Sequence, residues 1–270
     1  MKVHLYSWCW NDGHMLPFLF RHYDALVERY VIYDDGSTDG SLDILRAHDR
    51  VELRKADFTA DRTSLLNSGM TLAQECWKES RGGADWVIVT EIDEHLYHRD
   101  FPTYLASCKS KGVTIIPALG YQMLSNSFPS VDITLCQSLT KGAPWVQMNK
   151  LNIFSPNAVE EINYTPGRHT CEPVGEIVLP SRDELLLLHY KYLGFERTHE
   201  RHEQYAARLR QADIAVGYAH KWRWSREQLR KDWLQFEAAL VDISAPALSP
   251  WLTHKERRWW ERYPRIGDRD

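Results

Sequence analysis

The stretch Ala84–His98, with the sequence ADWVIVTEIDEHLYH, limits the fold of this chain more than any other. Its first part, Trp86–Val89, is apolar at every position, which is typical of a strand buried on both faces of a parallel sheet. Glu91, Asp93 and Glu94 follow at once, and burying three carboxylates without partners would cost too much free energy. Side chains alternate along a strand, so Glu91 and Asp93 could share one Mg²⁺ or Mn²⁺. The simpler interpretation is a strand that ends in solvent with acidic residues.

A second acidic segment, DDGSTDGS at residues 34–41, follows a short apolar strand predicted at Tyr30–Tyr33. In an open α/β sheet, ligands bind beyond the carboxyl ends of the strands, so we expect Asp34 and Asp35 beside the end of the Trp86–Thr90 strand. The segment lacks the GxGxxG and GK[ST] patterns of phosphate-binding loops. Its carboxylates could accept hydrogen bonds from a base or a ribose, and the segment could equally be a turn that caps a helix.

Strands and helices alternate through the first part of the chain. Further strands are predicted at Val3–Trp8 and Val51–Lys55, and helices at Met15–Glu28 and Ser64–Glu79, from the spacing of their apolar residues. This order predicts an α/β fold with a mostly parallel, Rossmann-like sheet flanked by helices.

Composition narrows the class of protein. The 270 residues are 43% hydrophobic and 26% charged, which is ordinary for a globular protein, and the net charge of −4 argues against a nucleic-acid partner. The five cysteines are scattered without a CxxC pair, which favours a reducing compartment. The N-terminus turns polar too early for a signal peptide, and Leu185–Leu188 is too short to span a bilayer. We expect a cytoplasmic protein.

The charge balance changes near residue 195. Residues 196–270 hold 15 Lys and Arg against 12 Asp and Glu, together with six of the eleven tryptophans, whereas residues 1–195 have a balance of −7. We therefore expect a core domain over 1–195 and a helical extension over 196–270. Trp222, Trp233 and Phe236 recur on one side of a helix, which favours packing onto the core. A basic, tryptophan-rich helix could instead lie on the inner face of the cell membrane as a peripheral contact.

Several motifs together resemble those of family 2 glycosyltransferases, which have the GT-A fold. The resemblance rests on Asn11…Leu16-Pro17-Phe18…Arg21-His22-Tyr23, on residues 31–40 and on residues 84–94. It is closest to the bacterial branch whose acidic motif reads DxDEF, and it covers about the first hundred residues well and residues 145–220 loosely. Glu91 stands where that family usually has Asp, and His95 where it usually has Phe.

The resemblance implies a nucleotide-sugar donor and a divalent metal, Mn²⁺ or Mg²⁺. It implies that Asp35 meets the base or the ribose, and that Asp93 coordinates the metal that binds the diphosphate and assists its departure. Glu91 would join the metal site directly or through water. The donor-binding residues expected from it are Asn11, Asp34, Asp35, Asn67, Lys150 and His169.

Two further residues follow from the same comparison. His189 comes directly after Leu185–Leu188, at a position that resembles a late metal-binding histidine of GT-A enzymes, although it could also be an ordinary core histidine. An inverting transfer needs a base for the acceptor hydroxyl. We expect Glu172 in this role, because it lies on a predicted loop after His169, with Glu176 as the next candidate. The charged helix after residue 195 carries His199 and His202, which we expect to face solvent.

The predicted function is transfer of a sugar from a nucleotide sugar to a glycan or glycolipid acceptor, with inversion, as in bacterial polysaccharide biosynthesis. A sugar nucleotidyltransferase is the alternative enzyme, although Trp8–His14 lacks the glycine-rich, basic loop usual in that class. A non-catalytic carbohydrate-binding protein on the same fold is the other alternative, which the Glu91 substitution favours.

Overall fold

The computed structural model describes residues 1–56 and 63–267 of the chain. Within these residues ten strands form one mixed sheet, whose main path runs β12-β7-β6-β8-β4-β1-β2-β3, with β11 and β5 attached through β6. The strands are β1 (Val3–Cys9), β2 (Arg29–Asp34), β3 (Val51–Lys55), β4 (Trp86–Val89), β5 (Glu94–Tyr97), β6 (Ile115–Ser125), β7 (Lys141–Pro144), β8 (Lys150–Phe154), β11 (Leu186–Leu193) and β12 (Val241–Asp242), with β9 (Val159–Glu161) and β10 (Val174–Gly175) as a separate pair.

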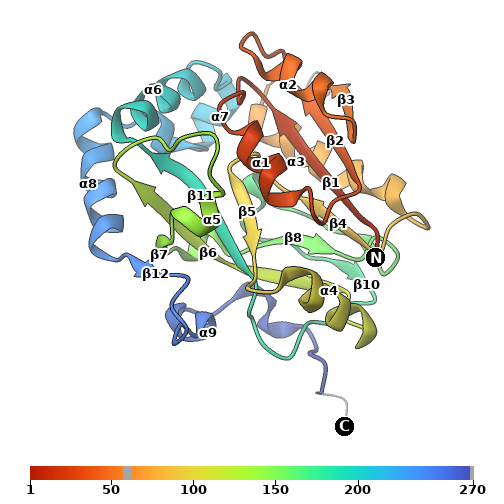
Figure 1. The fold of residues 1–270 in the computed structure, drawn as a ribbon. Coiled ribbons are helices and arrows are strands. Elements are labelled where there is room, and N and C mark those ends of the chain that lie inside the picture. The colour runs from red at the N-terminus through yellow and green to blue at the C-terminus, as the bar shows by residue number, and fades with distance from the viewer. Residues whose placement is uncertain (57–62, 268–270) are drawn as a thin grey trace.

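Helices cover the sheet and continue into the C-terminal part of the chain (Figure 1). The α-helices are α1 (Leu16–Tyr23), α2 (Ser41–Ala47), α3 (Leu65–Glu75), α4 (Phe101–Ser110), α5 (Leu135–Ser138), α6 (Phe195–Ala206), α7 (Gln211–Val216), α8 (Arg226–Ala238) and α9 (Pro250–Thr253). The short 3₁₀ helices are η1 (Cys76–Ser80), η2 (Val146–Met148), η3 (Pro166–Arg168), η4 (His220–Arg223) and η5 (Trp259–Arg262).

The predicted α/β fold with helices flanking a mostly parallel central sheet is confirmed. Strands β3, β2, β1 and β4 are parallel neighbours, and β4 is buried at all four positions, as its unbroken apolar run predicted. The first helix is shorter than the expected Met15–Glu28. It runs from Leu16 to Tyr23, with Pro17 in its first turn.

Strand β11 lies between β6 and β5. It runs parallel to β6 and antiparallel to β5, so His189 lies opposite Gln122 on one side and opposite Glu94 on the other. Because β5 begins directly after the acidic turn that follows β4, this pairing carries His189 to the acidic end of β4. Antiparallel strands β8, β7 and β12 complete the sheet beyond β4.

The C-terminal part packs against the core. Trp233 of α8 is fully buried and stacks on Tyr192 with 5.1 Å between ring centroids. Trp260 is also fully buried, and its indole N–H donates to the buried carboxylate of Asp183. The expected inward packing is therefore confirmed for Trp233, whereas Trp222 lies in η4 and not on the same helix as Trp233 and Phe236. Strand β12 extends the main sheet.

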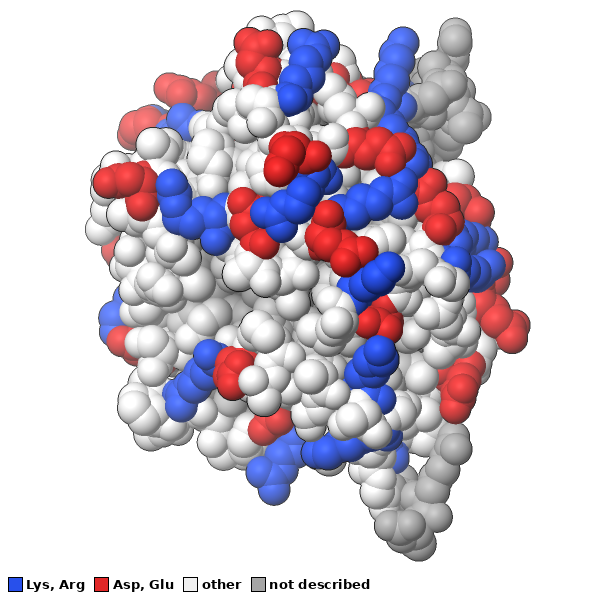
Figure 2. Space-filling view, turned by 45° about the vertical axis from the view of Figure 1, so that its right-hand side comes forward, with Lys and Arg blue, Asp and Glu red and all other residues white. Residues whose placement is uncertain are grey.

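Within residues 1–56 and 63–267, every helix is too short or too polar to cross a membrane. Figure 2 shows basic and acidic side chains interleaved over the face it presents.

Candidate active site

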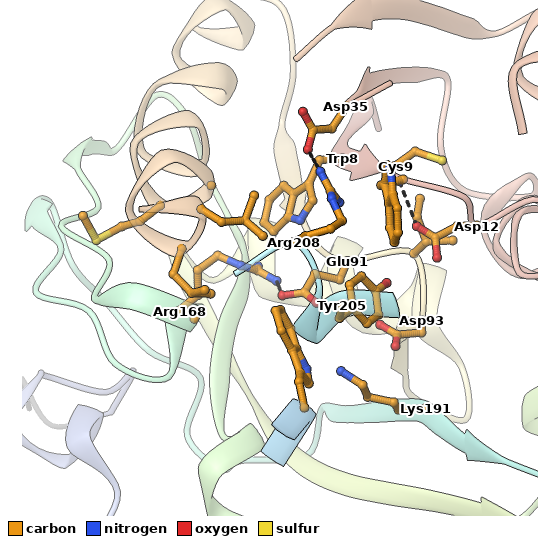
Figure 3. Close-up of a pocket in the computed structure, with 18 residues that line it drawn as sticks. Trp8, Cys9, Asp12, Asp35, Glu91, Asp93, Arg168, Lys191, Tyr205 and Arg208 are labelled. Carbon is orange, nitrogen blue, oxygen red and sulfur yellow. Dashed lines mark hydrogen bonds and ion pairs between the residues drawn. The ribbon is translucent and has the colours of Figure 1, made fainter. Parts of the chain in front are cut away.

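A cavity of about 120 Å³ opens where the carboxyl ends of β1, β2 and β4 meet (Figure 3). The parallel register pairs Cys9 with Asp34 and Tyr6 with Val89, so the segments that leave these strands lie side by side. Asp35, Glu91 and Asp93 all line this cavity, as the strand order predicted. The full lining is Trp8, Cys9, Trp10, Asp12, Asp35, Leu65, Leu66, Gly69, Met70, Glu91, Ile92, Asp93, Gly167, Arg168, Lys191, Tyr205, Arg208 and Trp222.

Asp93 and His189 face each other at this site. Oδ2 of Asp93 lies 3.7 Å from Nε2 of His189, although the two residues are 96 positions apart. A backbone hydrogen bond from the N–H of Tyr190 to the carbonyl of Asp93 fixes the relative position of the two segments. The sequence-based expectation that both strand ends meet is thus met by the fold.

The protonation of His189 follows from its contact with Gln122. The amide nitrogen of Gln122 donates to the carbonyls of Met123 and His189, so its Oε1 must face Nδ1 of His189, at 2.7 Å. Nδ1 therefore carries the proton, and Nε2 turns a lone pair toward the carboxylate of Asp93. Burial, reinforced by Lys191, lowers the pKa of His189 to about 3, so the imidazole is neutral at neutral pH.

The carboxylate of Asp93 and Nε2 of His189 are atoms of the kind that bind a divalent cation. Ligand atoms about 2.1 Å from one cation lie roughly 3 to 4 Å from each other, and the 3.7 Å separation of Asp93 and His189 falls in this range. No three His, Cys, Asp or Glu side chains form a metal-binding group within the described ranges 1–56 and 63–267. The donor set fits a Mg²⁺ or Mn²⁺ ion that takes its other ligands from phosphates and water.

Glu94, the third carboxylate of the acidic motif, has a different role. It is fully buried and accepts hydrogen bonds from Lys150 at 2.6 Å, Arg168 at 2.7 Å and Asn152 at 3.0 Å. Burial alone would raise the pKa of Glu94, but Lys150 and Arg168 hold it well below its ordinary value. Lys150, which we expected to contact the diphosphate or the sugar, forms an ion pair with Glu94 instead.

Arg168 links Glu94 to Glu91. It is 2% exposed, donates to the carbonyl of Val89, and places its guanidinium 3.7 Å from the carboxylate of Glu91, as Figure 3 shows. Its backbone has a φ of +58°, uncommon for a residue with a side chain, directly after Gly167. Sequence reasoning treated these residues only as a turn.

Lys191 was also missed by sequence reasoning. Its ammonium lies 5.2 Å from the ring centroids of both Tyr205 and Trp222, and it lines the cavity opposite Asp93. It forms no ion pair within 4 Å among the residues that the structure describes. Burial lowers the pKa of Lys191, while Asp93 and Glu91 oppose that shift. It lies two residues after His189, and both residues line the larger neighbouring cavity, so its position in the sequence could have revealed it.

The DDGSTDGS segment is held mainly by local hydrogen bonds. Asp34 accepts from the backbone N–H groups of Gly36 and Ser37, and Asn11 accepts from the N–H of Thr38 at 2.7 Å. Asp34 and Asn11, both expected to bind the donor, therefore shape the loop that presents Asp35.

Two arginines from the C-terminal part reach the carboxylates of the cavity. Arg208 forms an ion pair with Asp35, and its guanidinium lies 4.0 Å from the centroid of the Trp10 ring. Arg201 of α6 pairs with Asp12 at 2.7 Å. Burial raises the pKa of Asp12 to about 6, against the opposing effect of Arg201.

The remaining expected residues lie outside this cavity. Asn67 is on another face of α3 than Leu66 and Met70, and its N–H caps onto Ser64. His169 donates from Nδ1 to the carbonyl of Gln147 at 2.6 Å and lines a neighbouring, larger cavity. Glu172 is a surface residue, 75% exposed, and pairs with Arg262 at 3.2 Å.

The expectation that His202 faces solvent is wrong, because it is only 2% exposed. Helix α6 packs on β11, which turns its polar face at Thr198 and His202 inward, toward Tyr192. Charge pattern alone could not reveal this, since a charged helix normally keeps such residues in water.

No protein-family model and no curated protein matches the chain. Among solved structures it is similar to TarS 1-349 from S. aureus in complex with UDP, with a TM-score of 0.39 and 11% identity over 58% of this chain and 47% of that one. It is also similar to glucosyl-3-phosphoglycerate synthase from Mycobacterium tuberculosis in complex with Mn²⁺, UDP and glucosyl-3-phosphoglycerate, with a TM-score of 0.31 and 17% identity over 44% of each chain. These matches span less than half of those chains.

Proposed function

We propose that this chain is a divalent-metal-dependent glycosyltransferase of the GT-A type that uses a nucleotide-sugar donor. The observation that carries the proposal is the pair Asp93 and His189, whose Oδ2 and Nε2 converge at 3.7 Å beside a cavity at the carboxyl edge of the sheet. Such a pair suits a cation that also binds a diphosphate. When bound, Mn²⁺ or Mg²⁺ would neutralise negative charge on the departing nucleoside diphosphate.

Lys191 is assigned to the same diphosphate. Its ammonium lies over the rings of Tyr205 and Trp222. Among the described residues, the carboxylates of Asp93 and Glu91 attract this charge from beyond ion-pair distance. A partly desolvated cation that faces a cavity attracts an anion strongly. Lys191 would hold the diphosphate in the ground state and stabilise the charge that develops when the sugar leaves.

The nucleoside is assigned to the aromatic part of the cavity. Trp8 and Trp10 supply the apolar surface, and Asp35, at the start of the loop after β2, borders it. Asp35 would accept a hydrogen bond from the ribose or the base, in exchange for part of its contact with Arg208. UDP, the nucleotide in the complexes of TarS and the synthase, is the first nucleotide to test.

The base for an inverting transfer is proposed to be Glu91 rather than Glu172. Glu91 lines both the small cavity and the larger one beside it, and Arg168 orients its carboxylate from 3.7 Å. Glu91→Gln should lower turnover and leave donor binding in place, whereas Glu172→Gln should leave both unchanged. The reverse pattern would return the role to Glu172.

Calorimetric titration with UDP in the presence and absence of Mn²⁺ tests the proposal. We expect Mn²⁺ to tighten UDP binding, Asp93→Asn to remove that dependence, and the exposed-site control Asp43→Asn to behave as the unaltered protein. Slow release of sugar from a UDP-sugar to water would add evidence for an enzyme. A protein that binds no nucleotide diphosphate with any divalent metal would contradict the proposal, and binding without hydrolysis would favour a non-catalytic carbohydrate-binding protein.

Formation of a nucleotide sugar from a nucleoside triphosphate and a sugar phosphate would point instead to a sugar nucleotidyltransferase. A glycan or glycolipid is the proposed acceptor class, in line with the polysaccharide biosynthesis expected from the sequence.

A further inference from the structure

A second cavity, of about 510 Å³, lies next to the candidate active site. Glu91, Lys191 and Trp222 line both cavities, so a ligand in the larger one would reach the groups assigned to the diphosphate. His189, the proposed metal ligand, lines the larger cavity as well.

One wall of this cavity comes from the C-terminal part of the chain. Residues 217–222 line it, and the backbone there turns sharply, with Ala219 at a φ of +49°. The N–H of Trp222 donates to the carbonyl of Ala219 at 2.9 Å, which holds the turn closed. A residue other than glycine in this conformation is held there by its surroundings, as is common at ligand sites.

Trp145 provides a flat surface next to this wall. The ammonium of Lys221 lies 4.8 Å from its ring centroid and pairs with Asp232 at 2.9 Å, and Phe236 meets the ring edge to face. Trp145 is thus fixed in orientation, with its ring centroid 5.8 Å from that of His189. An immobilised aromatic ring with a negative face suits the C–H groups of a sugar ring.

Of the charged groups that line the cavity, Lys150 and Lys221 are matched within the protein, whereas Glu91 and Lys191 also face the neighbouring small cavity. Lys150 pairs with Glu94, and Lys221 pairs with Asp232. The other polar side chains of the lining are Gln122, Gln147, His169, His189, Tyr192, His202, Tyr218 and His220. His202 is 2% exposed, and its Nδ1 has no hydrogen-bond partner among the described residues. A buried polar atom of this kind indicates a missing partner.

We propose that this cavity binds the acceptor, and that the acceptor is an uncharged saccharide whose ring stacks on Trp145, with residues 217–222 as its outer wall. The proposal rests on the proposed function. In the transfer, the acceptor oxygen bonds to the anomeric carbon and the bond from that carbon to the diphosphate oxygen breaks. The hydroxyl proton passes to Glu91, and the nucleoside diphosphate leaves with the electron pair.

Binding of small saccharides to the full-length protein tests this assignment. A panel of methyl glycosides of common hexoses and deoxyhexoses, with the matching sugar phosphates and uronic acids, would be examined by saturation-transfer NMR in the presence of Mn²⁺ and UDP. We expect at least one uncharged glycoside to bind in preference to the charged compounds. Trp145→Ala should weaken that binding about tenfold or more, and Trp145→Phe should retain most of it.

The control variant is Trp251→Ala, which removes a partly exposed tryptophan that lines another cavity. It should not change glycoside binding. Unchanged Mn²⁺-dependent UDP binding by Trp145→Ala would show that this variant is folded. Preference for charged sugars, failure of every uncharged glycoside to bind, or binding that ignores Trp145 would each overturn the inference. If the unaltered protein does not bind UDP, the proposed function is contradicted instead, so the two failures are distinguishable.

Discussion

Nε2 of His189 and Oδ2 of Asp93 approach to 3.7 Å, and Nε2 carries no hydrogen because Gln122 holds the proton of His189 on Nδ1. Gln122 therefore acts through His189, as residues that hydrogen-bond to metal ligands commonly do.

The first prediction concerns this supporting contact. Gln122→Leu should raise the Mn²⁺ concentration needed for half-maximal UDP binding by about 10- to 100-fold, because His189 loses the partner that sets its tautomer. Titration of Mn²⁺ at constant UDP measures this, with the exposed Gln137→Leu as a control. A variant with a lower melting temperature but an unchanged Mn²⁺ requirement would show that Gln122 serves stability alone.

The second prediction concerns the buried ion network. Glu94→Leu should lower the free energy of unfolding by about 3–5 kcal/mol, because Lys150 and Arg168 would lose the carboxylate that compensates their burial. Urea unfolding measures this. The control Glu227→Leu, at an exposed pair with Lys231, should change it by less than about 1 kcal/mol. Equal effects in both variants would contradict the role of Glu94.

The same network gives a pH dependence. The pKa of Glu94 in the folded protein is well below its value in the unfolded chain, so its contribution is complete above the unfolded pKa. It is lost as the pH falls through the lowered, folded-state pKa. Stability of the unaltered protein should thus drop more steeply in acid than that of Glu94→Leu, and parallel curves would argue against this assignment.

The third prediction concerns Lys191. Lys191→Met should weaken UDP binding by about 1.5–3 kcal/mol, since a charged hydrogen bond to the diphosphate is lost. The measurement is calorimetric titration, with the exposed Lys231→Met as the matched control. Binding of uridine without phosphates should not change, and a loss of uridine binding would place Lys191 elsewhere in the mechanism.

The fourth prediction concerns the pair Asp35 and Arg208. Asp35→Ala should weaken UDP binding by about 1–3 kcal/mol if the nucleoside hydrogen-bonds to this carboxylate. Arg208→Ala, which frees Asp35 from its ion pair, should keep or tighten binding of uridine. If Arg208→Ala weakens uridine binding as much as Asp35→Ala does, the pair acts as one structural unit.

The fifth prediction concerns the C-terminal part. Deletion of residues 220–270 removes the fully buried Trp233 and Trp260, so the melting temperature should fall and apolar surface should become exposed. Differential scanning fluorimetry and dye binding measure both effects. A truncated protein of unchanged stability that has lost salt-sensitive binding to anionic vesicles would instead support the peripheral membrane contact.

The sequence by itself determined which segments form the site. Buried parallel strands need unbroken apolar runs, and the polar residues that end such runs must collect at the carboxyl edge of the sheet. For this reason Asp35, Glu91 and Asp93 could be placed together from the sequence. His189 could be added because it ends a later apolar run and resembles a known position.

Only the tertiary structure decided what each polar group contacts. Lys150 is drawn to Glu94, 56 residues away, and Arg208 reaches Asp35 across 173 residues. Asp34 and Asn11 accept hydrogen bonds from backbone N–H groups of the loop after β2. His202 turns inward because its helix packs on β11. Ion pairs and burial depend on distances set by the whole fold, and residue spacing along the chain carries little information about them.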